Sequence, residues 1–388
     1  MRAPGIAHAG MRMLSLAWLV LMPLALLVFV VQSIRDGHGA WAIDFNGNFR
    51  EPAREILHGA SPYHPDELVR VRAAVDAGQS PIDYEHGVFA AYPAPSLLLG
   101  VPFTALPYAL AAWLWFGLVL AAGGFALYLA GVRDRLVYGA ALLAPPVIGS
   151  LYYGAIDLVL MLGLAACWRW RDHAGRAGLA LGAIIALKLV ALPLVLWLLA
   201  TRRWRAAATS LVVAGALALA GWAAIGFDGL TGYPHLLSLL TDIESARGYS
   251  AVAGAIALGA GSATAAWAPY VAGACLLAAL SAVALQRGRS ADPATFLLGV
   301  LAAIAFSPIV WQHSYALVLV PLAVLRPRFG PIWGLPVLLW LAPDSPDVAE
   351  PFQLLACALV IGAISAWALE SHLRGGSGRL SAESIPIA

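Results

Sequence analysis

Long apolar runs, separated by short segments rich in arginine, occupy most of this 388-residue chain. The longer runs have roughly 17–25 residues, which as helices match a hydrocarbon core about 30 Å thick. Lipid offers no partners to unpaired backbone groups, so such runs are expected to be helical. The pattern predicts an all-α polytopic membrane protein with about 10–12 transmembrane helices. The candidate spans are 14–34, 108–131, 136–151, 156–168, 178–200, 206–225, 265–285, 294–310, 315–325, 331–342 and 352–370.

The composition supports this class of protein. With 61% hydrophobic and 11% charged residues and a mean hydropathy of +0.81, the chain has too little polar surface to cover a soluble globule. The net charge of +2 comes with arginines scattered over short loops, so nothing suggests a nucleic-acid partner. Cys167, Cys275 and Cys357 lie in apolar runs at unrelated spacings, and we expect small buried hydrophobes without a disulfide or metal.

The first apolar run, 14–34, follows a short basic tail and is too long for the core of a secretory signal. We therefore expect a retained anchor with its N-terminus in the cytoplasm, which places the next segment, 35–87, on the outer side. That first outer loop holds nine of the 21 acidic residues. We expect a single integral membrane domain over 1–370, with a second outer loop at 227–250 and a cytoplasmic tail at 371–388.

Arginine clusters between the spans indicate the cytoplasmic side. A count that places every cluster inside requires 178–200 to turn back on itself near Lys188, with 88–106 only dipping into the membrane. A competing count makes both segments full passes and restores the same sidedness from Arg202 onward. Both counts leave the first outer loop, 227–250 and Trp311-Gln312-His313 outside. The clusters are Arg133/Arg135, Arg169/Arg171/Arg176, Arg202/Arg203/Arg205, Arg287/Arg289, Arg326/Arg328 and Arg374/Arg379.

The first outer loop contains a segment with helical periodicity directly after Asp44. Its pattern predicts an amphipathic helix lying along the membrane surface and ended by Gly59 and Pro62, although a plain connector would show the same pattern. Asp44 stands where the chain leaves the membrane. Its carboxylate is either a general base, able to take a proton from a sugar hydroxyl, or a helix N-cap. The apolar residues of the helix are Phe45, Phe49, Ile56 and Leu57.

Lys188 lies in the middle of an apolar run, where a cation costs about 2.5–3.5 kcal/mol on insertion scales. Such a cost suggests a role, either holding a phosphate group or pairing with a buried carboxylate such as Asp157. Asp157 follows Tyr152-Tyr153-Gly154 at the start of a span. Its pattern is that of a solvated helix cap, with a site residue as the alternative.

A third polar group, Trp311-Gln312-His313, comes directly after the helix break at Ser307-Pro308. His313 can donate to a phosphate oxygen or a sugar hydroxyl, and Trp311 can stack on a sugar ring. An interfacial aromatic belt with a histidine at the membrane edge would give the same pattern. The same two interpretations apply to Tyr63, Tyr92 and Tyr233.

Several of these segments, in this order and spacing, resemble glycosyltransferase family 87, polyprenol-phosphate-mannose-dependent α-mannosyltransferases of the GT-C superfamily. The resemblance runs from Asp44 to about Leu325. One departure is Gly154-Ala155-Ile156-Asp157, where the family often has Gly-Gln-x-Asn, and another is the longer spacing from Lys188 to Pro193. The matching segments are Asp44-Phe45, Gly59-Ala60-Ser61-Pro62-Tyr63, Tyr92-Pro93-Ala94-Pro95, Ala186-Leu187-Lys188-Leu189, Arg202-Arg203-Trp204-Arg205 and Ser307-Pro308-Ile309-Val310-Trp311-Gln312-His313.

The resemblance implies a GT-C fold and an inverting hexosyltransferase, with mannose as the expected sugar. It places the enzyme in the cell membrane, with its active site on the extracytoplasmic side. It implies a polyprenyl-phosphate-sugar donor, a glycolipid or glycan acceptor, contact with membrane lipids and no nucleic acid. The catalytic aspartate falls on Asp44 and the late histidine on His313. No Asp-x-Asp metal motif or Gly-rich phosphate loop is present, so we expect no metal and no cofactor.

We expect Lys188 and Gln312 to bind the donor phosphate or lipid, and we expect a further set of mostly aromatic residues to contact the sugar or acceptor. The alternative function is a polytopic transporter or flippase of sugar or lipid-linked substrates, which more often shows matched halves and an intramembrane charge relay. The expected sugar- or acceptor-binding residues are Phe45, Tyr63, Tyr92, Trp311 and Asp157.

Overall fold

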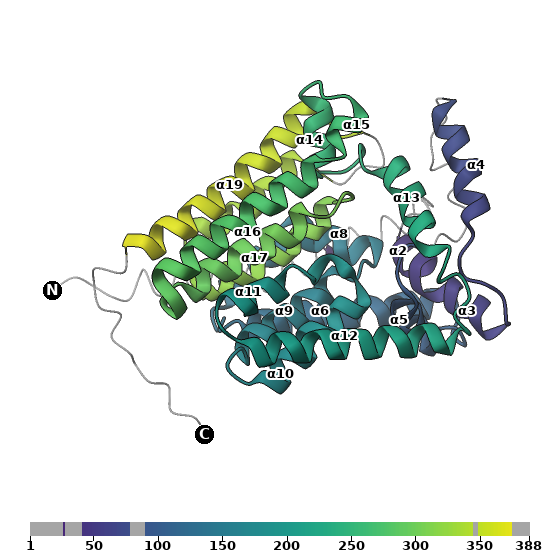
Figure 1. Cartoon of the computed structure of the whole chain (residues 1–388), viewed down its shortest axis with the longest axis horizontal. Coiled ribbons are helices and arrows are strands. Elements are labelled where there is room, and N and C mark those ends of the chain that lie inside the picture. The colour runs from purple at the N-terminus through teal and green to yellow at the C-terminus, as the bar shows by residue number, and fades with distance from the viewer. Residues whose placement is uncertain (1–25, 28–40, 78–89, 344–347, 375–388) are drawn as a thin grey trace.

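The structure is a computed structural model that describes residues 26–27, 41–77, 90–343 and 348–374. Apart from 26–27, the predicted first span at 14–34 lies outside the described residues, as does most of the predicted tail at 371–388. All regular secondary structure in the described ranges is helical, as the sequence predicts. The segments 43–76 and 233–244 lie together at one end of a bundle of longer helices (Figure 1).

The helical elements are short in the first outer loop and longer in the bundle. Those up to Lys188 are α2 (Ile43–Phe45), η1 (Asn46–Arg50), α3 (Glu51–Leu57), α4 (Pro65–Asp76), α5 (Ala94–Leu97), η3 (Leu98–Phe103), α6 (Tyr108–Leu129), α7 (Arg135–Leu143), α8 (Pro145–Tyr153), α9 (Asp157–Arg169) and α10 (Ala174–Leu187).

The second half begins with a one-turn helix directly after Lys188. Its elements are η4 (Leu189–Ala191), α11 (Leu194–Ala200), α12 (Trp204–Ala224), α13 (Tyr233–Glu244), α14 (Ala251–Ala257), α15 (Ser262–Ala265), α16 (Ala268–Arg287), η5 (Gly288–Ala291), α17 (Asp292–Ala305), η6 (Gln312–Val318), α18 (Leu319–Leu325), η7 (Pro331–Gly334), η8 (Pro336–Leu341) and α19 (Pro351–Arg374).

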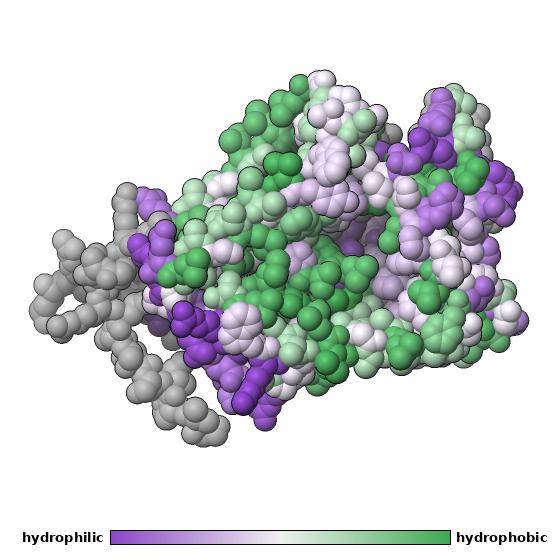
Figure 2. Space-filling view, in the orientation of Figure 1, coloured by the Kyte–Doolittle hydropathy of each residue, from purple (hydrophilic) through white to green (hydrophobic). Residues whose placement is uncertain are grey.

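Four helical runs of the described residues are long and apolar enough to cross a membrane, and five if α7 and α8, bent by 66°, form one span. Five shorter apolar helices of 10–17 residues lie among them, and the long runs of the described residues alone are fewer than the 10–12 expected spans. Hydrophobic residues cover the middle of the face in Figure 2, and hydrophilic residues gather toward its two ends. The four runs are Tyr108–Leu129, Trp204–Ala224, Ser262–Ala305 and Pro351–Glu370.

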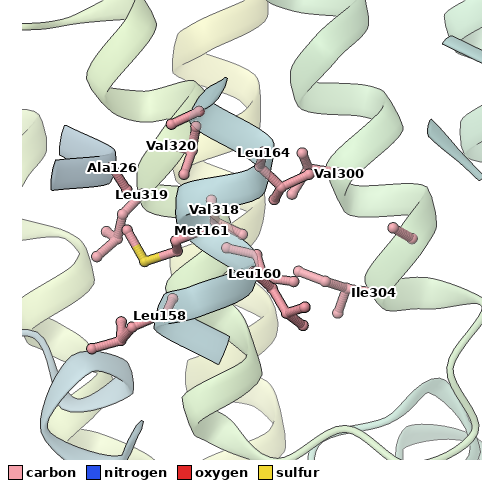
Figure 3. Packing of buried hydrophobic residues seen from close by; sticks show 14 of the residues in the cluster. Ala126, Leu158, Leu160, Met161, Leu164, Val300, Ile304, Val318, Leu319 and Val320 are labelled. Atoms are coloured by element: carbon pink, nitrogen blue, oxygen red, sulfur yellow. The ribbon is translucent and has the colours of Figure 1, made fainter. Parts of the chain in front are cut away.

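Helix α9 is the centre of the bundle. Almost every side chain from Asp157 to Trp168 is buried or half-buried. Figure 3 shows α9 residues Leu160, Met161 and Leu164 between side chains of α17 and of η6–α18. Close packing of this kind leaves a central helix little freedom to shift, so both of its ends are held in place.

The chain reverses direction at Lys188. The residue has extended backbone, with φ −152° and ψ 117°, and it ends α10 before η4 and α11 lead back. Arg203, just beyond α11, donates to Asp172, just before α10, so both ends of this hairpin lie at the same end of the bundle. The segment 178–200 therefore turns back on itself near Lys188, as the first of the two counts requires. Consistently, the apolar helix Ala94–Phe103 has too few residues to cross a core about 30 Å thick.

The arginine loops meet at the end of the bundle where α10 and α12 begin. The buried guanidinium of Arg203 donates to both carboxylate oxygens of Asp292 and also to Asp172. Arg171 donates to Asp292 from a second loop, 3.3 Å away, and Arg289 approaches Asp172. Three inter-helical loops are thus joined by one ionic network. Desolvation opposes the charge of Asp172, but the hydrogen bond from Arg203 and the positive charges of Arg203, Arg171 and Arg289 together outweigh it and lower the pKa of that carboxyl.

The first outer loop is helical from Ile43 to Leu57, but its apolar face does not lie on a membrane surface. Phe45 and Phe49 are fully buried in the protein, and both pack their rings against Trp115 of α6. The aromatic side chains of α6 offer a protein partner that periodicity cannot reveal. The predicted interfacial helix is therefore a docked helix, and of its apolar residues only Leu57 is exposed.

Candidate functional site

Asp157 occupies the N-terminal end of the central helix α9. Helix α8 ends at Gly154 with φ +71°, and the Trp115 Nε1–H donates to the Gly154 carbonyl over 2.8 Å. Asp157 is then the first residue of α9 and is fully buried, while Ile156 is the N-cap. The expectation of a solvated cap at Asp157 is wrong, because the carboxylate points into the protein, where a cation is available.

Lys188 is that cation. Its Nζ lies 3.5 Å from Asp157 Oδ1 and 5.3 Å from the centre of the Tyr92 ring. The reversal that ends α10 is held by the Ser96 hydroxyl, which donates to the Leu187 carbonyl. The break in the helix is therefore what turns the lysine toward Asp157. From the sequence, either a phosphate or a carboxylate was expected to pair with Lys188. The structure shows the pair with the carboxylate of Asp157.

His313 approaches the other oxygen of the same carboxylate. Its Nε2 lies 3.8 Å from Asp157 Oδ2, and its ring packs at 6.0 Å from that of Tyr153. The loop that carries it is fixed by the Tyr249 N–H, which donates to the Val310 carbonyl over 2.6 Å. A Cβ at Gly248 would lie 2.3 Å from that carbonyl oxygen, so this close approach requires glycine. The second outer loop thus positions the histidine segment.

Asp44 is brought beside this group by the same glycine that ends α8. A Cβ on Gly154 would lie 2.8 Å from Phe45 Cβ, and the Ala42 N–H donates to the Tyr152 carbonyl over 2.7 Å. Asp44 is partly buried and interacts electrostatically with Lys188 and Tyr92. It is the middle residue of α2, whose N-cap is Ala42, so Asp44 does not cap this helix. The helix widens to π geometry directly after it, a feature frequent at functional sites.

A small pocket lies between the ends of α9, α10 and α17. Its polar lining is Asp157, Lys188, Ser307 and Ser314, and the rest is aliphatic. Asp44 and His313 do not line it but adjoin it through Lys188 and Asp157. Neither serine was among the site residues expected from the sequence. The helix break at Pro308, which lies between them, could have indicated them, since a broken helix within a membrane protein commonly lines a cavity.

The other expected contact residues lie in different places. Tyr92 packs beneath Lys188, and Trp311 is partly exposed at the start of η6. Phe45 is fully buried beside Trp115, so it is a core residue in this conformation. The Nε2 of Gln312 donates to the backbone carbonyls of Leu339 and Ala342, which occupies the donors expected to bind a phosphate. Gln312 therefore fixes the loop.

Tyr63 likewise belongs to a packing cluster of the outer loops. Its ring stacks on Trp222, and its hydroxyl donates to the Tyr92 carbonyl over 3.1 Å. Burial, with a smaller contribution from Tyr233, raises the pKa of the Tyr63 phenol above its ordinary range, so the group stays a neutral donor. The hydroxyl of Tyr233 also holds this segment, by donating to the Ala91 carbonyl. Both tyrosines thus anchor the backbone on either side of Tyr92.

The site brings together two carboxylates, those of Asp44 and Asp157, and the basic side chains of Lys188 and His313. The amine of Lys188 can attract an anion entering the pocket, while the Asp44 carboxylate nearby can accept a proton. Among the described residues, no three His, Cys, Asp or Glu side chains lie together in a way that could hold a metal ion. Lys188 and Asp44 therefore offer electrostatic attraction and proton transfer.

A multi-pass helical protein with a polar, ion-paired pocket at one end of its bundle has the organisation of a membrane-embedded enzyme. The sequence model of glycosyltransferase family 87 matches residues 89–308, more than half of the chain, and the chain belongs to this family of membrane glycosyltransferases. The matched residues include Asp157 and Lys188, whereas His313 lies shortly after the matched range and Asp44 well before it. Neither a curated protein nor a solved structure matches the chain.

Proposed function

We propose that this glycosyltransferase moves a hexose, mannose by family resemblance, from a polyprenyl-phosphate donor to a glycolipid or glycan acceptor. The transfer inverts the anomeric centre, needs no divalent metal and takes place on the extracytoplasmic face. The observation that carries the proposal is the ionic chain from Lys188 through Asp157 to His313, with Asp44 within electrostatic reach of Lys188. These groups come from four distant parts of the sequence.

The donor is proposed to place its single phosphate against Lys188. One cation can balance one phosphodiester charge, whereas nucleotide-sugar diphosphates commonly require a divalent ion. The hydroxyl of Ser314 lines the same pocket and can donate to a phosphate oxygen, whereas the Ser307 hydroxyl donates to the Ile309 carbonyl. Exposed leucines and valines of α12 and α16 offer apolar surface to a prenyl chain at bilayer depth.

Asp44 is proposed to act as the general base. It takes the proton of an acceptor hydroxyl, whose oxygen attacks the anomeric carbon from the face opposite the phosphate. The bond between that carbon and the phosphate oxygen breaks, and its electron pair stays with the phosphate. His313 and Lys188 are placed to stabilise the charge that the phosphate gains.

The donor is tested by incubating the purified protein with polyprenyl-phosphate mannose, polyprenyl-phosphate glucose and a nucleotide-diphosphate sugar. We expect transfer from a polyprenyl phosphate only, with mannose preferred, measured as labelled sugar in extracted lipid or glycan. The activity should persist in EDTA. Transfer from the nucleotide sugar, or activity lost in EDTA and restored by magnesium or manganese, would contradict the proposed donor chemistry.

The proposed sidedness follows from the arginine loops, since positively charged loops face the cytoplasm and the pocket lies at the other end. We expect Ala60→Cys and Thr231→Cys, both exposed in outer loops, to react with an impermeant thiol reagent in intact cells. The background variant carries Cys275→Ser, because Cys275 is the exposed cysteine and Cys167 and Cys357 are buried. Ser290→Cys, in an arginine loop, should react only after permeabilisation. The reverse pattern would place the pocket in the cytoplasm.

A further inference from the structure

A buried carboxylate inside a pocket for an anion requires a physical reason. Asp157 is fully buried, and its Oδ2 has no hydrogen-bond donor among the described residues, although His313 Nε2 lies 3.8 Å away. The side chain of Lys188 is 23% exposed and that of Asp157 only 1%. The amine is therefore the more accessible of the two groups. Both residues line the pocket, so an anion that contacts Lys188 also lies near Asp157.

This position gives Asp157 two effects on a bound phosphate. It holds Lys188 and His313 toward one point, at 3.5 Å and 3.8 Å, which orients both groups. It also repels any negative charge in the pocket, in a buried setting where Coulomb interactions are screened less than in water. The first effect is one of geometry, and an uncharged side chain of the same shape would retain part of it. The second depends only on charge.

The charge of the phosphate changes during the proposed reaction. A polyprenyl-phosphate sugar is a phosphodiester with one negative charge. When the bond between the sugar and the phosphate oxygen breaks, the product is a phosphate monoester, which carries about −1.5 to −2 at pH 7. A fixed negative charge near the phosphate therefore destabilises the bound product more than the bound donor.

We propose that Asp157 is a positioning and charge-discriminating residue that weakens binding of the monoester product relative to the diester donor and so favours product release. The inference rests on the proposed function, because it takes the pocket as the phosphate site. It also gives a physical reason for an acidic residue at this position, since an amide there could orient Lys188 but could not repel the product.

The test compares wild-type protein with Asp157→Asn, which removes the charge at nearly constant shape, and Asp157→Glu, which keeps the charge and changes the shape. The probes are farnesyl phosphate, a monoester, and farnesyl methyl phosphate, a diester, titrated into purified protein in detergent. We expect Asp157→Asn to strengthen monoester binding relative to diester binding by about tenfold at low salt. Asp157→Glu should keep the wild-type ratio of the two dissociation constants, even where its activity is low.

If Asp157 has only a structural role, both variants should bind both probes more weakly to the same extent. An unchanged ratio of the monoester and diester dissociation constants in Asp157→Asn overturns the inference. If that variant does not fold, Asp157→Ser, also uncharged, takes its place under the same criterion. In turnover assays, added polyprenyl phosphate should inhibit Asp157→Asn more strongly relative to its donor KM. A protein that transfers sugar but shows no change of ratio contradicts only this inference. A wild-type protein that binds neither probe contradicts the proposed donor as well.

Discussion

Asp44→Asn is expected to lower the rate of sugar transfer at least 100-fold while donor binding changes little. General-base assistance is typically worth about 10²–10⁴-fold, and asparagine keeps the size of the side chain but cannot accept the proton. The loss should appear in kcat and in kcat/KM together, since the interaction matters most in the transition state. Initial rates with polyprenyl-phosphate mannose at saturating acceptor measure it.

A matched control is Asp66→Asn, which neutralises an exposed carboxylate at the start of α4, away from the pocket. We expect this variant to transfer sugar at the wild-type rate. Asp44 stands inside its helix and does not cap it, so its exchange for asparagine should leave the fold intact. An Asp44→Asn variant that elutes from a size-exclusion column like the wild-type protein, and retains more than about a tenth of its transfer activity, would exclude Asp44 as the base.

Arg203→Met is expected to destabilise the protein by about 3–5 kcal/mol. The change leaves the buried carboxylate of Asp292 without the guanidinium that donates to both of its oxygens, and an uncompensated buried charge is costly. Arg171, at 3.3 Å, compensates only in part. Thermal or denaturant-induced unfolding in detergent measures the loss.

The double variant Arg203→Met with Asp292→Asn serves as its control. Removing the carboxylate charge along with the cation should recover a large part of the lost stability, because the charge that needed a partner is gone. If the single and double variants unfold alike, the network at the arginine end contributes little and the hairpin is held by apolar packing alone.

Some assignments followed directly from single residues. A lysine in the middle of an apolar run is costly, so Lys188 had to have a partner, and Asp157 was one of two expected. The arginine clusters allowed two topologies, of which the contact between Arg203 and Asp172 supports one. Asp44 drew attention by its place after the first apolar run, and it does lie within electrostatic reach of Lys188. Whether it is catalytic stays a prediction.

Other assignments failed because residue type does not reveal what lies opposite a side chain. Phe45 looked like a membrane or substrate contact, but Trp115, some seventy positions later, covers it. Gln312 looked like a phosphate ligand, but the carbonyls of Leu339 and Ala342 already accept its hydrogen bonds. Ser307 and Ser314 looked like ordinary loop residues in the sequence, but the break at Pro308 lets both line the pocket.

Local properties of the chain determined its class, because the hydropathy of each run decides whether it prefers lipid and the arginines indicate which loops stay inside. Those properties are additive along the sequence and need no knowledge of neighbours in space. The grouping of Asp44, Asp157, Lys188 and His313 depends instead on the reversal at Lys188, the tight packing of Phe45 on Gly154 and the contact of Gly248 with Val310. Only the tertiary structure decided it, because each of these contacts joins segments whose separation along the chain leaves no periodic trace.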